Sequence, residues 1–175
     1  MTSDRQIMTT ADIAQVLAVA SASTDVRDLY AAVEQLAARV SGFVLFTVLK
    51  YVDDGTAVER VYSSDEQAYP VGGRKQLSSI SMNHAEMDRG QVFLAANRDE
   101  VKQTYPDHEL IFSLGITAIM NAPIHYQGRR LGTLNLSGVE GGYGDADKAN
   151  ARILAGLLAP ALLVDAGAPV RSDGA

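Results

Sequence analysis

The sequence predicts an α+β domain in which helices lie against a central antiparallel sheet. Two pairs of strand patterns carry this prediction, one over residues 43–63 and the other over residues 115–137. Helical patterns precede the first pair and follow the second, over residues 25–40 and 145–163. A chain of 175 residues with 47% hydrophobic content provides one domain with ample apolar material for a core.

The later strand pair is the most informative part of the chain. Residues 115–125 and 128–137 have the pattern of two strands joined by a tight turn. In the second strand Leu134 and Leu136 alternate with polar residues, a period of two that is typical of a half-buried strand. Those polar residues are Thr133, Asn135 and Ser137. One face of the sheet is therefore polar, which predicts a ligand pocket.

The earlier strand pair and the helix before it follow from composition and spacing. Residues 43–52 and 57–63 are rich in Val, Phe and Tyr, which strands prefer, and Asp53-Asp54-Gly55 separates them. Asp25 can cap a helix whose apolar residues recur every three or four positions. They are Leu29, Val33, Leu36 and Val40. We expect this helix to pack on the sheet.

The two terminal helices carry more apolar residues than one sheet face requires. They are expected around residues 10–20 and 145–163, and Pro160 is expected to kink or shorten the second. The surplus apolar surface favours a homodimer over a monomer, although both stripes can also be ordinary core. Residues 1–9 and 165–175 are expected to be disordered, because they contain too few apolar residues to bury a stabilising amount of surface.

Charge and composition exclude several classes of function. The net charge is −6 and the basic residues are scattered, which argues against a nucleic-acid partner. Apolar runs are too short to span a membrane and the N-terminus has no secretory pattern, so a cytoplasmic protein is expected. The chain has no cysteine, which excludes disulfides, thiolate catalysis and metal sites built on sulfur.

The second strand pair also carries a resemblance to a known family. Residues 114–138, LGITAIMNAPIHYQGRRLGTLNLSG, resemble the closing hairpin of a GAF domain, with its small-residue strand, proline, turn glycine and hydrophobic strand. Residues 90–95 resemble the short central strand of that family, and residues 107–114 resemble the helix after it. With the terminal helix at 145–163, the resemblance covers residues 10–164.

The resemblance implies a GAF-like, PAS-related fold over residues 10–164. In such a fold the N- and C-terminal helices lie on one face of the sheet, and a ligand pocket lies under a loop and helix lid on the other. It also implies a homodimer formed by packing of the terminal helices. Bilin attachment through cysteine and reduction of methionine sulfoxide are excluded, since both need the missing thiol. The Asn-Lys-x-x-x-Phe-x-Asp-Glu run of cyclic-nucleotide-binding GAF domains is absent as well.

Candidate pocket residues come from both strands and from the segment expected to cover them. We expect the lining to include Met82, Met87, Phe112, Met120, Asn121, Thr133 and Asn135. Asn121 and Asn135 lie on adjacent predicted strands. Asparagine is disfavoured in strands, so its presence at both positions indicates a specific role for the two side chains. Their amides can orient a polar ligand, or they can bind a buried loop backbone with no ligand at all.

Two histidines are candidate axial ligands of haem iron. His84 falls on the apolar face of a short predicted helix beside Met87, where a neutral imidazole is unusual. A half-exposed helix histidine is the plain alternative. His108 follows an aromatic-proline turn, as the proximal histidine does in some haem-binding GAF sensors, but the spacing to Pro123 is longer here. A structural role in the loop is equally compatible with its position.

These expectations converge on a cytoplasmic, stand-alone GAF domain that binds a small organic ligand and acts as a sensor on a partner in trans. The alternative is a haem-binding GAF protein that senses a gas or acts as a small-molecule enzyme, for example a lyase that cleaves N-nitro compounds. A third possibility is a structural partner protein with a collapsed pocket. No hydrolase motif or phosphate-binding loop is present, so the sequence leaves open whether the protein is an enzyme.

Overall fold

The computed structural model describes residues 5–79 and 87–165. Its helices are α1 (Thr10–Ala22), α2 (Val26–Val40), α4 (Arg98–Thr104), α5 (His108–Ser113) and α6 (Asp145–Asp165). Its strands are β1 (Leu45–Val52), β2 (Ala57–Ser63), β3 (Arg74–Gln76), β4 (Phe93–Ala95), β5 (Ala118–Tyr126) and β6 (Arg129–Gly138). Two short 3₁₀ turns are η1 (Asp53–Gly55) and η2 (Leu77–Ser79).

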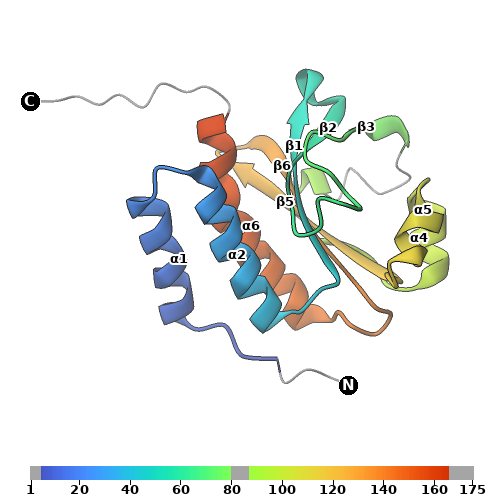
Figure 1. Cartoon of the computed structure of the whole chain (residues 1–175), viewed down its shortest axis with the longest axis horizontal. Coiled ribbons are helices and arrows are strands. Elements are labelled where there is room, and N and C mark those ends of the chain that lie inside the picture. The colour runs from blue at the N-terminus through green and yellow to red at the C-terminus, as the bar shows by residue number, and fades with distance from the viewer. Residues whose placement is uncertain (1–4, 80–86, 166–175) are drawn as a thin grey trace, which may run out of the picture.

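The strands of the described residues form one six-stranded sheet in the order β3-β2-β1-β6-β5-β4. Every neighbouring pair is antiparallel. Helices α1, α2 and α6 lie together on one face of this sheet, while α4 and α5 lie at its other side (Figure 1). The prediction of an α+β fold with the terminal helices on one face of an antiparallel sheet is therefore confirmed.

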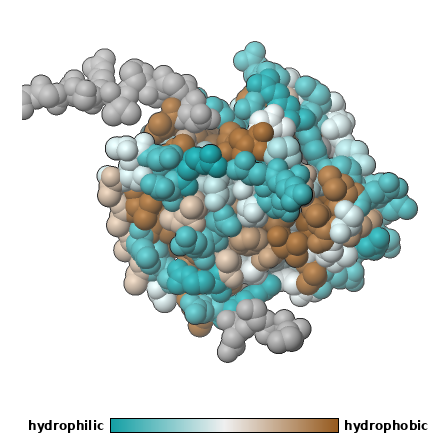
Figure 2. Space-filling view, viewed as in Figure 1, coloured by the Kyte–Doolittle hydropathy of each residue, from teal (hydrophilic) through white to brown (hydrophobic). Residues whose placement is uncertain are grey.

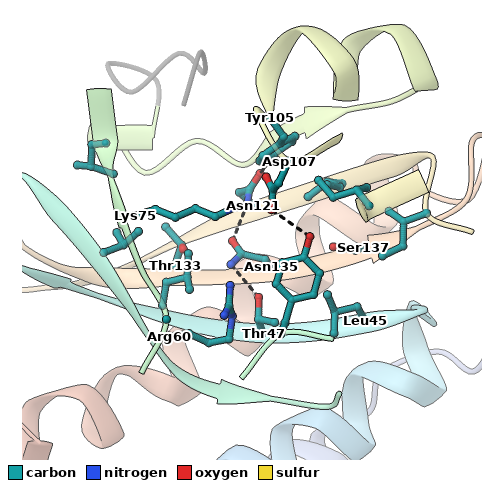
Figure 3. Close-up of a pocket in the computed structure, with 18 of the residues that line it drawn as sticks. Leu45, Thr47, Arg60, Lys75, Tyr105, Asp107, Asn121, Thr133, Asn135 and Ser137 are labelled. Atoms are coloured by element: carbon teal, nitrogen blue, oxygen red, sulfur yellow. Dashed lines mark hydrogen bonds and ion pairs between the residues drawn. The ribbon is translucent and has the colours of Figure 1, made fainter. Parts of the chain in front are cut away.

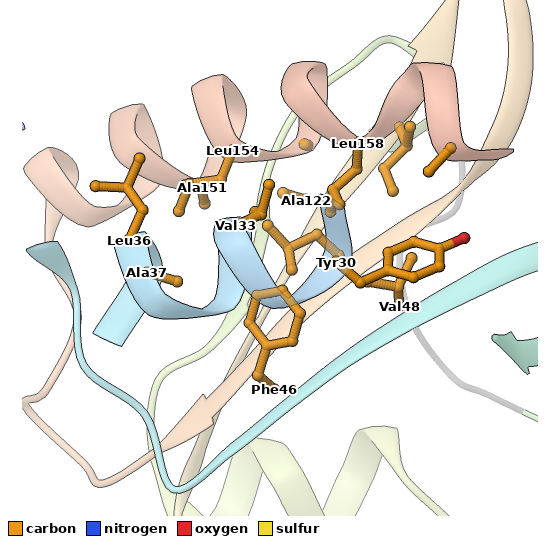
Figure 4. Close-up of a cluster of buried hydrophobic side chains, with 14 of the residues drawn as sticks. Tyr30, Val33, Leu36, Ala37, Phe46, Val48, Ala122, Ala151, Leu154 and Leu158 are labelled. Carbon is orange, nitrogen blue, oxygen red and sulfur yellow. The ribbon is translucent and has the colours of Figure 1, made fainter. Parts of the chain in front are cut away.

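The main hydrophobic core fills the space between the sheet and helices α2 and α6. Val33 and Leu36 of α2 are fully buried in it, and so are Leu154 and Leu158 of α6 (Figure 4). Alternate residues of the strands complete this core, namely Phe46, Val48, Met120, Ala122, Leu134 and Leu136. The period of two thus sends one set of strand side chains to the helices and leaves the intervening set on the opposite face.

A second, smaller apolar cluster lies on that opposite face. Leu45 of β1 and Ile119 of β5 contribute to it from the sheet, and Ile111 and Ile116 contribute from α5 and the turn after it. Val101 of α4 is fully buried in the same cluster. These contacts hold α4 and α5 against the sheet face that does not carry the terminal helices.

The chain ends differ in two details from the expectations. Residues 5–9, expected to be disordered, contact the domain: Arg5 pairs with Asp147 at 3.0 Å, and the Gln6 amide donates to the Arg39 carbonyl. Helix α6 continues past Pro160 to Asp165, so the proline does not end it. Pro160 is exposed, which lets water hydrogen-bond the carbonyl that loses its backbone donor.

In the part of the chain that the structure describes, no helix has the length and apolar character needed to cross a bilayer.

Candidate ligand-binding pocket

A pocket lies on the sheet face that is turned away from the terminal helices. The empty space between its side chains, including the mouth that opens to solvent, is about 820 Å³. Strands β1, β5 and β6 form the floor, and the chain around Tyr69, Met87 and Tyr105 forms the walls. The floor residues are Leu45, Thr47, Leu49, Tyr51, Ile119, Asn121, Thr133, Asn135 and Ser137.

The centre of the floor is a row of polar residues placed by strand register. Asn135 of β6 lies opposite Thr47 of β1 on one side and opposite Asn121 of β5 on the other. Each of the three is about nineteen-twentieths buried, with 5–6% exposure. Their strand neighbours Phe46, Met120, Leu134 and Leu136 point to the helical core. The same alternation that builds the core therefore sets three polar side chains in line under the pocket.

These side chains form a directed chain of hydrogen bonds (Figure 3). The Tyr105 hydroxyl donates to Oδ1 of Asn121, and Nδ2 of Asn121 donates to Oδ1 of Asn135. Nδ2 of Asn135 then donates to Oγ1 of Thr47 at 3.1 Å. Each amide nitrogen carries two hydrogens and uses one of them in this chain. The floor can therefore offer further donors to a molecule in the pocket.

Tyr105 closes one end of this chain. It directly follows α4 and is 7% exposed. Burial raises the pKa of Tyr105 far above its ordinary value, so the hydroxyl keeps its proton and can donate. In this arrangement the Asn121 oxygen faces Tyr105, and the Asn121 amide nitrogen faces Asn135.

A second polar cluster lies in the wall, around Asp107. Its Oδ2 accepts hydrogen bonds from Lys75 Nζ at 2.6 Å and from the Tyr69 hydroxyl at 3.1 Å. Burial by itself raises the pKa of Asp107, but the hydrogen bond and positive charge of Lys75 outweigh it, and the net pKa is lowered. Asp107 is therefore ionised at neutral pH and joins β3 to the chain before α5.

Arg60 of β2 contributes a buried positive charge to the same pocket. One guanidinium nitrogen donates to the Pro70 carbonyl at 2.9 Å, and the guanidinium carbon lies 4.8 Å from the centre of the Tyr69 ring. Gly73 leaves the space for it, because a Cβ there would lie 2.7 Å from an Arg60 nitrogen. Burial lowers the pKa of Arg60, which remains charged at neutral pH.

The structure brings together four of the residues expected at the pocket and separates others. Met87, Asn121, Thr133 and Asn135 line it. Met120 points to the other face and is fully buried in the helical core, because adjacent strand residues cannot share a face. Phe112 packs under Arg98, whose guanidinium carbon is 3.6 Å from the ring centre, and is absent from the lining. Met82 lies outside the described residues.

One of the two candidate haem ligands lies away from the described pocket lining, and the structure does not describe the other. His84 lies outside the described residues. His108 begins α5, where its Nδ1 is 3.1 Å from the Tyr105 carbonyl and its ring packs against Phe112. No histidine lies in the lining formed by residues 5–79 and 87–165, and these residues hold no group of three acidic or histidine side chains suited to a metal.

Several polar pocket residues were not singled out from the sequence, among them Thr47, Arg60, Tyr69, Tyr105 and Asp107. For two of them, the alternation of side chains along a strand could have predicted a position on the pocket face. Thr47 lies between the apolar Phe46 and Val48, and Arg60 lies two positions after Val58. Tyr105 and Asp107 lie in a loop, where no periodicity indicates which way a side chain points.

Comparison with known proteins identifies the fold. No protein-family model matches the chain, and no curated protein matches it by sequence. Among solved structures, it is similar to the phycocyanobilin-bound GAF domain of a cyanobacterial phytochrome, with a TM-score of 0.68 and 14% identity, over 90% of this chain and 94% of that one. It is also similar to the GAF domain of a phosphoenolpyruvate-protein phosphotransferase from Coxiella burnetii, with a TM-score of 0.68 and 15% identity, over 89% and 93% of the two chains.

A third similar structure belongs to a longer protein. It is the chromophore-binding domain of an unusual bacteriophytochrome from R. palustris, with a TM-score of 0.66 and 13% identity. The match covers 88% of this chain and 61% of that one, so this chain spans less than two thirds of its length. At such identities the likeness concerns the fold alone, and the sheet order and helix placement agree with it. The chain therefore has the fold of the GAF domains.

Proposed function

We propose that this domain binds a small organic molecule in the pocket and acts as a cytoplasmic sensor on a partner protein in trans. The observation that carries the proposal is the row Asn121–Asn135–Thr47, closed at one end by Tyr105, on the floor of an otherwise largely apolar cavity. Apolar walls with a few convergent polar groups are typical of sites that bind small molecules. An organic ligand gains affinity from the walls and orientation from the amides.

The similar structures support this reading by analogy. One of them is a GAF domain solved with phycocyanobilin, and another is a chromophore-binding domain. The same fold thus accommodates an organic molecule in those proteins, although fold alone does not fix function. This chain has no cysteine, so a ligand here is held without a thioether bond. The described lining contains no imidazole either, while the candidate haem ligand His84 lies outside the described residues.

The test is a fluorescence titration with N-phenyl-1-naphthylamine, a neutral dye that brightens in apolar cavities. We expect saturable binding of one dye per domain. Ser137→Phe, which places a ring in the cavity from the floor of β6, is expected to weaken binding at least tenfold. Ser113→Phe is the matched control, because Ser113 is exposed on α5 and absent from the lining. Equal affinity in Ser137→Phe and wild type would place the dye outside the pocket and contradict the proposal.

We also propose that the terminal helices form a homodimer. Leu17 of α1 is 50% exposed, and Ile153 and Val164 of α6 are 42% and 56% exposed. Figure 2 shows apolar surface over α1 and near the C-terminal end of α6. In α1 only Val16 is buried, although the helix is apolar on most sides. A helix that is apolar all round is usually covered on all sides. The rest of the described chain leaves part of α1 uncovered.

Sedimentation velocity tests the dimer. We expect wild-type protein to sediment as a dimer at micromolar concentration and Leu17→Glu to sediment as a monomer, because a charge on this face opposes burial. Gln15→Glu adds the same charge at another exposed position of α1 and serves as the control. A wild-type monomer, or a dimer that persists in Leu17→Glu, counts against this interface.

A further inference from the structure

Arg60 is a buried cation that has no carboxylate within ion-pair distance among the described residues, although Asp107 raises its pKa from farther away. Its side chain lies in the pocket lining and the residue is 8% exposed. Among the described residues it forms no ion pair, and its Nε, although buried, has no hydrogen-bond partner. Its contacts are the Pro70 carbonyl and the face of the Tyr69 ring. Arginine is seldom buried to this degree unless an anion accompanies it.

The remaining charges of the pocket are already matched. Lys75 and Asp107 pair at 2.6 Å, so they neutralise each other. The described lining therefore holds two formal positive charges and one negative charge, with Arg60 as the surplus. A ligand with a single negative charge would balance it. A dianion would leave one negative charge uncompensated in the pocket, which is unfavourable wherever that charge is kept from water.

The surplus charge lies at one end of a graded cavity. Arg60 and Lys75 come from β2 and β3 and lie on the same side of the pocket, while Leu45 lies at the far side (Figure 3). The far side also carries the apolar residues Ile111, Ile116 and Ile119. The amide row crosses the floor between these two ends. The cavity thus has both cations at one end, with the apolar Leu49 and Val58 beside them, a polar row in the middle and isoleucines at the other end.

We infer that the pocket takes an amphipathic monocarboxylate, with the carboxylate against the Arg60 guanidinium and an apolar or aromatic body against the isoleucine wall. This inference rests on the proposed function, since it names the ligand class of the same site. A guanidinium matches a carboxylate through charge-assisted hydrogen bonds, and the Arg60 side chain lines the pocket. The amide row then contacts polar groups along the ligand body.

The test compares three probes that share one bicyclic body and differ in the charge of the head group: 2-naphthoate, 2-naphthamide and 2-naphthyl phosphate. The chain has no tryptophan, so naphthalene fluorescence reports binding without tryptophan emission. We expect 2-naphthoate to bind wild-type protein at least about tenfold more tightly than the neutral amide, as a hydrogen-bonded buried charge pair provides. We expect the phosphate to bind more weakly than the carboxylate.

Substitutions assign the preference to Arg60. Arg60→Met keeps the length and removes the charge, and it is expected to bring naphthoate and naphthamide affinities within about twofold of each other. Lys102→Met removes a positive charge from the exposed face of α4 and should leave the tenfold preference intact. If Arg60→Met does not fold, as judged by circular dichroism, Gly73→Ala displaces the guanidinium instead and should reduce the preference.

The outcomes separate this inference from the proposed function. Equal binding of naphthoate and naphthamide to wild-type protein overturns the carboxylate assignment but leaves a ligand pocket. Tighter binding of the phosphate overturns the preference for a single charge. Binding of N-phenyl-1-naphthylamine without binding of any of the three probes also overturns the inference alone. If the neutral dye fails to bind in the pocket as well, the proposed function fails with it.

Discussion

Asn121 on β5 and Asn135 on β6 lie directly opposite each other, and Nδ2 of Asn121 donates a hydrogen bond to Oδ1 of Asn135. The row of hydrogen bonds continues beyond the pair, to the Tyr105 hydroxyl at one end and to Thr47 at the other. Asparagine is a poor strand former, and burying amides is favourable only when they are hydrogen-bonded. The row therefore keeps the pocket floor polar without leaving these amides unpaired.

The Tyr105–Asn121 hydrogen bond should appear as a coupling in stability. Tyr105→Phe leaves the Asn121 oxygen buried without this donor, so we expect the free energy of unfolding to fall by about 1–3 kcal/mol. Asn121→Leu leaves the tyrosine hydroxyl unpaired and should have an effect of similar size. Urea denaturation of the single and double variants measures the coupling. Losses that simply add in the double variant would show that the two side chains do not interact.

Gly132 of β6 is required by close approach of the backbone. A Cβ there would lie 2.0 Å from the Leu49 carbonyl oxygen and 2.8 Å from a methyl carbon of Leu162. We expect Gly132→Ala to lower the free energy of unfolding by more than about 3 kcal/mol, since strand backbone must shift. Gly156 on the exposed side of α6 has no neighbour within 4 Å, so Gly156→Ala should raise stability by up to about 1 kcal/mol. Thermal melts of both variants check the contrast.

Asp107 should make stability depend on pH in the acid range. Its pKa in the folded state is lowered below the unfolded value of about 3.9, with the opposing effect of burial outweighed by Lys75 and Tyr69. The contribution is therefore fully present above about pH 4 and is lost as the pH falls through the lower folded pKa. We expect the stability difference between wild type and Asp107→Asn to be constant from about pH 5 to 7 and to narrow below about pH 4. Urea midpoints measured across this range test it.

The control for that experiment is Glu140→Gln, which removes an exposed carboxylate that has no ion pair among the described residues. Its stability difference from wild type should stay small throughout the range. A difference for Asp107→Asn that stays constant down to about pH 2 would show that the carboxylate is not held ionised by Lys75.

His108 should play no part in binding haem. Its Nδ1 lies near the Tyr105 carbonyl and its ring packs on Phe112, outside the described lining. We expect wild-type protein and His108→Ala to give the same absorption spectrum with one equivalent of haemin, before and after dithionite. A sharp, reducible Soret band in wild type that disappears in His108→Ala would reverse this conclusion and favour the haem alternative.

Periodicity predicted the frame of the fold because each hairpin buries one side of its strands. The alternation around Leu134 and Leu136 assigned one strand face to the core, and the structure places both residues there. Met120 was expected in the pocket together with Asn121, but the two residues are adjacent on β5. Adjacent residues of a strand point to opposite faces of the sheet, so only one of them can line the pocket. The strand rule, applied consistently, separates pocket from core on β5.

The walls of the pocket were less accessible to sequence reasoning. Tyr105 and Asp107 lie between two short helices, and their directions depend on tertiary contacts with Asn121, Lys75 and Tyr69. Such contacts join residues 16–38 positions apart, beyond the reach of local patterns. The sequence accordingly indicated a polar floor, but not that Arg60 and Asp107 line the same pocket.

The side-chain amides of Asn121 and Asn135 offer the most direct measurement, because their NH₂ groups give separate signals in a ¹⁵N-correlation spectrum. During titration with 2-naphthoate, we expect the largest shifts at these two NH₂ groups and at the backbone amides of Thr47 and Tyr105, with the terminal helices unaffected. Shifts confined to α1 and α6, or saturating shifts elsewhere with both asparagine side chains unchanged, would contradict a ligand site on the sheet floor.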